Sequence, residues 1–360
     1  MDDLKLLRDL GRELEHEPPT SLAHQQRRLL DPSARSRSAR PGGSRRTRTW
    51  AMVALAAGLT AAVVTVPTVL ISRSAGVLKT ADGPLSAGVE APTGPLNVLL
   101  IGSDSRAGDN RKYGQHMADE PGRSDTLVLV HLAADRKSAQ AVSIPRDSMV
   151  QIPECRASDG RKAPAHLGMI NSAYADGGLA CARKTIETLT GVTVDYAMAI
   201  DFSGFKDMID ALGGVEITMP KAVDDRKAKL RLPAGRQTLN GEQALGYARL
   251  RYTLGDGSDV MRIKRQQVLM RAIIKKAADL PADPVRLPAF LKAVQASVKT
   301  EPGLNLEEMV ALARSVAGMK PSDTRFVTIP WMPYPADPNR IAWKQPEASQ
   351  LFKRIASDSR

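Results

Sequence analysis

Aspartate and arginine residues stand together at the ends of three short apolar segments between residues 97 and 147. The residues are Asp104, Arg106, Arg123, Asp125, Arg146 and Asp147. Aspartate carboxylates are hard oxygen ligands for a divalent cation such as Mg2+, which binds one or two carboxylates together with phosphate oxygens. Arginine carries a permanent charge on a planar fork that matches phosphate geometry. Asp104 and Asp125 as metal ligands, with the arginines as phosphate ligands, predict phosphoryl chemistry. The alternative is a set of ordinary surface ion pairs at strand ends.

A second group of polar residues accompanies two predicted helices in the C-terminal half. Asn240 with Gln243 three residues later is a capping box, so a helix begins there. Two arginines leave the end of this helix at alternate positions, where both can point the same way. One helical turn separates an arginine and a glutamine near the start of the next helix, and this pair suits phosphate oxygens. A solvated helix face is the alternative for that pair. The four candidates are Arg249, Arg251, Arg262 and Gln266.

The elements that position these charges read as a sheet covered by helices. Short runs of Leu, Val and Ile bounded by Gly, Pro and Asp predict strands, and their continuous apolar character indicates burial on both faces. The expected strands are 97–101, 127–130, 141–144, 194–200, 215–219 and 324–329. The expected helices are 169–178, 180–190, 201–214, 240–249, 262–278, 285–298, 306–319 and 346–356. This order predicts an α/β fold, an α-β-α sandwich around a central mixed β-sheet.

The N-terminal part predicts a membrane anchor. Residues 1–48 are polar and basic and form a largely disordered tail, whereas residues 49–72 carry no charge and are long enough to span a bilayer. Arg45, Arg46 and Arg48 precede this run, so the positive-inside rule leaves the N-terminus in the cytoplasm. A cleaved signal peptide is the alternative. Residues 73–95 then form an extracytoplasmic linker, and residues 96–360 the catalytic domain.

The predicted extracytoplasmic location affects the interpretation of the net charge and of the two cysteines. The net charge of +12 indicates anionic partners, but an extracytoplasmic domain without nucleic-acid-binding motifs excludes DNA and RNA. A disulfide persists outside the cytoplasm, so Cys155 and Cys181, the two cysteines of the chain, are expected to form a bridge. Separate buried thiols are the alternative.

The motifs around these charges occur in an order that resembles the LytR-CpsA-Psr family of cell-wall glycopolymer ligases. The resemblance covers about residues 96–280 behind a single predicted anchor. Its motifs are Gly102–Arg106, Arg123–Thr126, Ile144–Asp147, Ile170–Asn171, Leu239–Glu242, Arg249–Arg251 and Arg262–Gln267.

The resemblance implies transfer of a glycopolymer with its phosphate from polyprenyl pyrophosphate to a peptidoglycan hydroxyl, with Mg2+ or Mn2+ as cofactor. It implies metal ligation by Asp104 and Asp125, with Asp147 orienting Arg146 or acting as acid or base. The implied catalytic residues are Arg123, Arg146, Asp147 and Arg249. The implied substrate-binding residues are Arg106, Asn171, Arg251, Arg262 and Gln266. An apolar groove that includes Val194, Phe202 and Phe205 would hold the prenyl chain, unless these residues are plain core.

Two other functions fit the same sequence. A pyrophosphatase would act on the same lipid-linked substrate with water in place of the sugar hydroxyl. A non-catalytic envelope regulator or wall-polymer binder would use the basic surface alone. Loss of Asp104 or Arg123 abolishes activity in an enzyme and is tolerated by a binder, so these substitutions separate the classes.

Overall fold

The computed structural model describes most of the chain beyond residue 92. The described residues are 79–80, 83–84, 93–113, 122–157, 160–251, 253–254, 257–278, 280, 286–301, 308, 311–312, 315–316 and 319–359. The predicted tail 1–48 and membrane span 49–72 lie outside them, as does most of the predicted linker. Within that linker β1 (Lys79–Thr80) and β2 (Gly83–Pro84) form a short antiparallel ladder. Among the described helices, none has the length and apolar content that a bilayer crossing requires.

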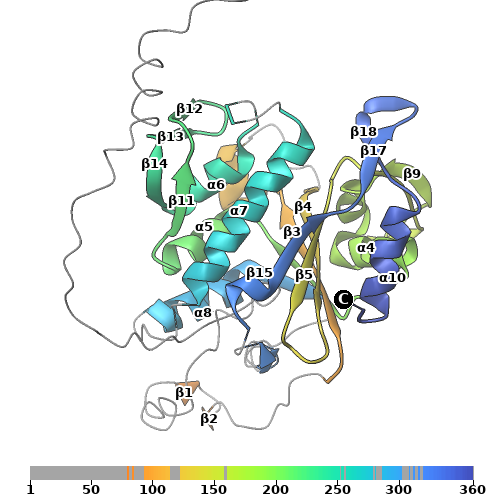
Figure 1. Ribbon diagram of the computed structural model, residues 1–360, viewed down its shortest axis with the longest axis horizontal. Helices are drawn as coiled ribbons and strands as arrows, with labels where there is room; N and C mark the ends of the chain where they lie inside the picture. The colour runs from red at the N-terminus through yellow and green to blue at the C-terminus, as the bar shows by residue number, and fades with distance from the viewer. Residues whose placement is uncertain are drawn as a thin grey trace, which may run out of the picture. The chain divides into compact units, whose positions relative to one another are not determined.

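A mixed sheet of six strands forms the centre of the domain (Figure 1). Its strands, in spatial order, are β15 (Val298–Glu301), β10 (Tyr196–Ile200), β3 (Leu96–Ser103), β4 (Ser124–Leu132), β5 (Ala139–Ile144) and β16 (Thr324–Thr328). β3, β4 and β5 run antiparallel to one another, whereas β10 is parallel to β3 and β16 is parallel to β5. The predicted mixed α/β sheet is therefore confirmed.

The apolar runs of the central strands supply two separate cores because successive side chains of a strand point to opposite faces. Val98 and Leu100 of β3 belong to one cluster of buried residues. Leu99 and Ile101 of the same strand belong to the other cluster. All four side chains are buried. Layers cover the sheet on both faces, as continuous rather than alternating hydrophobicity predicts.

Four helices and two hairpins cover the first face (Figure 1). The helices are α5 (Phe202–Ala211), α6 (Gly241–Arg249), α7 (Asp259–Ala277) and α8 (Arg286–Ser297). The hairpins pair β11 (Val215–Met219) with β14 (Gly235–Leu239), and β12 (Val223–Asp225) with β13 (Leu230–Leu232). The predicted capping box is present, because Asn240 Oδ1 accepts from Gln243 N at 2.9 Å and Gln243 Oε1 accepts from Asn240 N at 3.1 Å.

The second face is covered by α4 (Ser172–Thr190) and α10 (Glu347–Ala356). Short hairpins flank these helices and pair β6 (Met149–Ile152) with β9 (His166–Met169), β7 (Cys155–Arg156) with β8 (Lys162–Ala163), and β17 (Trp331–Tyr334) with β18 (Asp337–Trp343). A disulfide with an S–S distance of 1.97 Å joins Cys155 of β7 to Cys181 of α4. It ties the connection after β6 to the helix of this layer.

Several elements differ from the sequence expectation, and the short strands β6 to β9 and β12 to β14 were not expected. The two helices expected at 169–178 and 180–190 form the single helix α4, which is kinked at Gly177 and Gly178, where φ and ψ leave the helical range. The edge strand β15 follows α8 without a break, and the hairpin β17–β18 follows β16; neither was expected. Most of the helix expected at 306–319 lies outside the described residues. Two 3-10 turns, η3 (Gly108–Tyr113) and η6 (Pro321–Asp323), complete the described elements.

Candidate active site

The charged residues of the first group gather at one edge of the central sheet. β4 runs antiparallel to β3 and to β5, so the end of β3, the start of β4 and the end of β5 meet there. Asp104 Oδ1 accepts from the backbone N–H of Arg123 at 2.6 Å, and Asp104 N donates to the carbonyl of Arg123 at 2.9 Å. These two bonds fix the Asp104 carboxylate beside the start of β4.

An ion-pair network extends from this edge to helix α7. The guanidinium of Arg146 pairs with Asp125 and places Nε 3.5 Å from Asp147 and 3.4 Å from Asp259. Asp259 also pairs with Arg262, three residues further along α7. Only 4% of the Asp259 side chain and 6% of the Arg262 side chain are exposed. Charges this deeply buried are costly unless they are paired, so the network holds both guanidinium groups in place.

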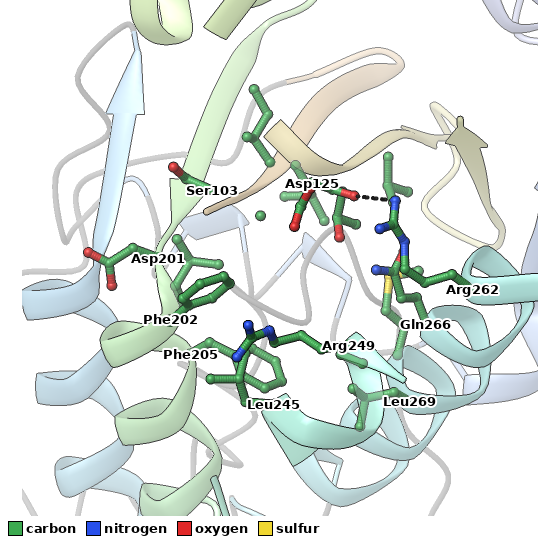
Figure 2. Close-up of a pocket in the computed structure, with 18 of the residues that line it drawn as sticks. Ser103, Asp125, Asp201, Phe202, Phe205, Leu245, Arg249, Arg262, Gln266 and Leu269 are labelled. Carbon is green, nitrogen blue, oxygen red and sulfur yellow. Dashed lines mark hydrogen bonds between the residues drawn. The ribbon is translucent and has the colours of Figure 1, made fainter. Parts of the chain in front are cut away.

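A cavity of about 370 Å³ opens beside the network, between the first face of the sheet and helices α5, α6 and α7. Figure 2 shows Phe202 and Phe205 on one wall, Arg262 and Gln266 of α7 on the opposite side, and Arg249 reaching across. Most of the wall is apolar. The apolar lining residues are Leu100, Ile101, Val128, Ile200, Phe202, Phe205, Met208, Ala228, Leu245, Ala248, Leu269, Met270 and Ile273. The cavity has the size and lining of a site for a largely apolar ligand.

The polar part of the lining is rich in arginine. It includes Arg146, Arg249, Arg251, Arg262 and Gln266 together with Asp125. The side chain of Arg249 makes no hydrogen bond or salt bridge with any residue in the described part of the chain; instead its guanidinium lies 5.1 Å from the ring centroid of Phe202. The Nε atoms of Arg251 and Arg262 are buried and have no hydrogen-bond partner among the described residues. Unsatisfied guanidinium donors beside an apolar cavity fit a ligand with an anionic head and an apolar tail.

Burial is the largest cause of the pKa shifts of Arg249, Arg262 and Asp259, whereas nearby carboxylates decide that of Arg146. Burial, with repulsion from Arg106, lowers the pKa of Arg249, and burial lowers the pKa of Arg262 despite its pairing with Asp259. Burial also raises the pKa of Asp259. For Arg146, burial opposes the charge, but the carboxylates of Asp125 and Asp147 outweigh it, so its pKa is raised. Burial thus disfavours the charged forms of Arg249 and Arg262, and a bound anion would favour them.

Comparison with known proteins identifies the family. The model of the LytR_cpsA_psr family matches residues 73–355. The chain belongs to this family. The matched region extends beyond the motifs at residues 96–280 on which the sequence resemblance depends, and it includes the cavity and both groups of charges.

Curated relatives of this LytR-CpsA-Psr protein carry names from cell-wall assembly. The chain is 32% identical over 266 residues to the "Cell wall biosynthesis protein LcpA" of Corynebacterium glutamicum, and the match covers 67% of this chain and 51% of the relative. It is 34% identical over 209 residues to a "Polyisoprenyl-teichoic acid--peptidoglycan teichoic acid transferase TagU" of Bacillus cereus, covering 57% of this chain and 60% of the relative. The chain therefore spans between about half and three fifths of the length of these two relatives.

Solved structures share the LytR-CpsA-Psr fold. The crystal structure of Bacillus subtilis TagV superposes with a TM-score of 0.59 at 25% identity and covers 74% of this chain and 98% of TagV. The structure described as "TagT bound to LI-WTA" superposes with a TM-score of 0.55 at 25% identity, covering 78% of this chain and 98% of TagT.

The structure brings some of the predicted LytR-CpsA-Psr site residues to the cavity and leaves others beside it. The residues that line the cavity are Asp125, Arg146, Arg249, Arg251, Arg262 and Gln266. Those that do not line it are Asp104, Arg106, Arg123, Asp147 and Asn171. Arg106 contacts the site from the side, with its guanidinium 5.0 Å from the ring centroid of Phe202. Asp147 lies between Arg146 and Arg340, whose Nη1 is 3.9 Å from Asp147 Oδ1.

Asn171 lies beside the site segments, whereas Val194 lies away from the predicted groove. The backbone of Asn171 accepts from Ser124 N at 3.3 Å and donates to the carbonyl of Arg146 at 3.3 Å, so Asn171 joins two site segments through main-chain bonds. Val194, expected in the prenyl groove, is instead buried in the core on the second face of the sheet. Phe202 and Phe205 of the same expectation do line the cavity.

Sequence reasoning missed Asp259 and Tyr113. Asp259 precedes Arg262 by three positions on α7, which is the spacing of helical ion pairs, so the signal was present. The pair was missed because the helix was expected to start at residue 262, whereas α7 begins three residues earlier, after the N-cap Ser258. Tyr113 lies at the end of η3, and its ring packs edge-on against Phe202 with centroids 5.3 Å apart. No periodic pattern in the loop after β3 indicated this contact.

The residues predicted to bind a metal ion, Asp104 and Asp125, are carboxylates near the sheet edge. No cluster of three or more His, Cys, Asp or Glu suited to a metal occurs among the described residues. Burial, with a contribution from the charge of Asp125, raises the pKa of Asp104, so these two carboxylates lie within electrostatic reach of each other. Two carboxylates with substrate phosphates are the ligands that Mg2+ commonly uses. Asp104 and Asp125 therefore fit the metal that the sequence resemblance implies.

Proposed function

We propose that the chain transfers a glycopolymer, with its phosphate, from a polyprenyl pyrophosphate carrier to a hydroxyl group of peptidoglycan. The observation that carries this proposal is the apolar cavity whose polar end is lined by Arg146, Arg249, Arg251 and Arg262. A polyprenyl pyrophosphate has an apolar chain and a compact anionic head, and the cavity offers one surface to each. Relatives named as polyisoprenyl-teichoic acid–peptidoglycan teichoic acid transferases support the same donor and acceptor.

In this reaction the peptidoglycan hydroxyl oxygen forms a bond to the phosphorus next to the glycan. The bond between that phosphorus and the bridging oxygen breaks, polyprenyl phosphate leaves with the electron pair, and the hydroxyl proton is released to solvent. Negative charge grows on the leaving phosphate, so arginines already fixed around it stabilise the transition state more than the ground state. Arg249 and Arg262 would contact the pyrophosphate, and Asp147 would keep Arg146 oriented, since it faces Arg146 and Arg340 rather than the cavity.

Asp104 and Asp125 would hold Mg2+ or Mn2+ at the sheet edge. When bound, the ion would neutralise phosphate charge as a Lewis acid. Arg123 would lie at the same place, because its backbone N–H holds the Asp104 carboxylate and its exposed side chain follows directly. Arg106, above Phe202, would add positive charge at the outer side of the pyrophosphate.

The proposed location is the outer face of the cytoplasmic membrane. The uncharged run 49–72 would anchor the chain with its N-terminus in the cytoplasm, and residues 73–95 would link the anchor to the domain. The disulfide between Cys155 and Cys181 supports an oxidising compartment for the domain. An anchored domain would meet its carrier substrate at the membrane surface.

A transfer assay tests the proposal. The purified full chain in detergent would be given a synthetic polyprenyl pyrophosphate glycan and Mg2+, with and without peptidoglycan, and also as the Arg249→Gln variant. Glycan attached to peptidoglycan by the native protein, with a loss of about 100-fold or more in the variant, is the expected result. The control is Arg231→Gln, because the Arg231 side chain is 88% exposed on β13 and its removal is expected to be neutral.

Two outcomes would overturn the proposal. Release of polyprenyl phosphate without any acceptor, unchanged by added peptidoglycan, would make the protein a pyrophosphatase. Binding of the lipid-linked glycan with no turnover under either condition would make it a wall-polymer binder.

A further inference from the structure

Four basic side chains converge on the ring of Tyr113, just outside the cavity. Lys112, Lys206, Lys229 and Arg249 place their charged groups 5.4, 5.4, 5.9 and 5.4 Å from its centroid. They come from four separate segments, which are η3, α5, the turn between β12 and β13, and α6. We name Tyr113 with these four residues the tyrosine cluster.

The tyrosine cluster is attached to the mouth of the cavity. The carbonyl of Tyr113 accepts from Arg106 Nη1 at 2.9 Å, and its ring packs edge-on against Phe202. Arg249 belongs both to the cavity lining and to the cluster. A ligand whose pyrophosphate contacts Arg249 would therefore present its next groups to Tyr113.

The balance of charge in the cluster is positive. Glu242 is the carboxylate that enters it, accepting from Tyr113 Oη at 2.7 Å and pairing with Lys206 Nζ at 3.2 Å. Burial opposes the charge of Lys206, but its bonds with Lys112, Tyr113 and Glu242 outweigh burial and raise its pKa, so this lysine stays charged at neutral pH. Among the residues that the structure describes, Glu242 is the carboxylate paired with this group, and the four cations around the ring give it a positive balance on a partly exposed surface.

The position of Lys229 is fixed by its turn. Asp225 Oδ1 accepts from Ala228 N at 2.9 Å, and Asp225 Oδ2 accepts from Thr253 Oγ1 at 2.7 Å. The backbone of Lys229 itself adopts a left-handed φ of 52°. The lysine is thus held beside Tyr113 by a built turn whose neighbours Lys227 and Ala228 line the cavity.

We propose that the tyrosine cluster is a subsite for an anionic group of the glycan, a phosphodiester or carboxylate one or two sugars beyond the pyrophosphate. The subsite rests on the proposed function, because it takes the part of the donor that extends out of the cavity. Lys112 and Lys229 bind the anionic group, and the face of Tyr113 packs against the adjacent sugar ring. The preferred donor is therefore an anionic rather than a neutral glycopolymer.

A glycan accounts for this arrangement better than an anionic membrane surface does. A bilayer attracts basic residues without requiring an aromatic ring among them, and it would not require the cluster to share Arg249 with the cavity. An aromatic ring surrounded by cations instead offers one surface to the C–H groups of a sugar and another to its acidic substituents. The shared arginine places that surface next to the reacting phosphate.

Lipid-free probes test the subsite separately from catalysis. An oligosaccharide with two phosphodiester groups and its neutral counterpart, both without lipid and pyrophosphate, would be titrated against the full chain by calorimetry. The test variant is Lys112→Gln/Lys229→Gln. The matched control is Lys275→Gln/Lys292→Gln, which removes the same charge from exposed positions in the last turn of α7 and on α8. We expect the anionic probe to bind more tightly than the neutral one, and the cluster variant to lose roughly three- to tenfold of that affinity.

The outcomes separate the subsite from the transfer reaction. Equal binding of the two probes by the native protein, or equal losses in the cluster and control variants, would overturn the subsite. A third result would also overturn it: the cluster variant alone loses binding to vesicles containing phosphatidylglycerol, while its affinity for the anionic probe is unchanged. That result would assign the lysines to the membrane. Failure of transfer in the native protein, with the probe preference intact, would refute the transferase and leave an anionic-glycan binding site.

Discussion

Removal of the disulfide is expected to lower stability and leave chemistry unchanged. Cys155 and Cys181 are 26 residues apart in sequence, and in the chain-entropy model a bridge over a loop of that length stabilises the folded state by about 3.5 kcal/mol. The bridge also secures a close contact, since a Cβ added at Gly177 would lie 2.8 Å from Cys181 Cβ and 3.0 Å from the carbonyl of Arg156. Cys155→Ala/Cys181→Ala should therefore cost about 3–4 kcal/mol of unfolding free energy.

Chemical denaturation followed by circular dichroism measures this loss, with the native protein compared in oxidised and reduced form. The oxidised native protein is expected to be the stable one, and the reduced protein should match the double variant. Transfer activity well below the unfolding temperature should be unchanged, because the bridge lies in the layer on the second face of the sheet and the cavity lies on the first. A loss below about 1 kcal/mol would refute the view that the bridge constrains the unfolded chain. A large loss of activity in the folded variant would refute the separation of the two faces.

Three further predictions concern the site. Burial raises the pKa of Asp104, so above that pKa its ionised carboxylate lowers folding stability. Asp104→Asn should therefore raise the unfolding free energy at pH 7 while it abolishes transfer. In the native protein, activity should fall with acidification at a higher pH than for an ordinary aspartate. A destabilised variant in denaturant titrations would contradict this prediction. Ala248→Phe should fill part of the cavity and raise KM for a long-chain donor but not for a donor with a short lipid, at a stability cost of about 1–3 kcal/mol; equal effects on both donors would count against a prenyl site. Asp259→Asn should lower kcat by roughly 100-fold with the fold retained, because Arg146 and Arg262 lose the carboxylate between them; kinetics identical to the native protein would exclude a positioning role.

The parts of the fold that sequence predicted are those with strong local signals. The apolar runs of β3, β4 and β5 are continuous and flanked by Gly, Pro and Asp, and the capping box of Asn240 and Gln243 marks a helix start by itself. The hairpin β17–β18 carries no such signal, because Trp331 and Met332 are exposed and its strands do not alternate apolar with polar residues. The two-residue kink of α4 reads in sequence as a helix end, although tertiary packing continues the helix beyond it.

The candidate site was predictable in its residue types and less so in its geometry. Strand-end charges converge because neighbouring strands are antiparallel, and this follows from topology alone once the sheet order is known. Which charges face the cavity depends on side-chain direction, and a shift of one residue along a strand moves a side chain to the other face. Val194 is an example. It precedes β10, and its side chain is buried in the core on the second face of the sheet instead of in the predicted groove. Prediction of Asp259 as a site residue depended on the residue at which α7 begins, and a pattern of apolar residues locates a helix start only to within a turn.

The two faces of the sheet divide stability from chemistry. The second face is closed by a disulfide and by α10, whose Phe352 packs against Trp343, and no arginine that lines the cavity belongs to that layer. The first face is left with a cavity of about 370 Å³ and with buried arginines whose own partners do not fully stabilise them. A cavity and incompletely paired charges both lower stability, so a well-packed layer on the opposite face is what allows the domain to retain them. The proposed transfer requires both features before the substrate binds, because the cavity would take the apolar chain and the arginines would take the pyrophosphate.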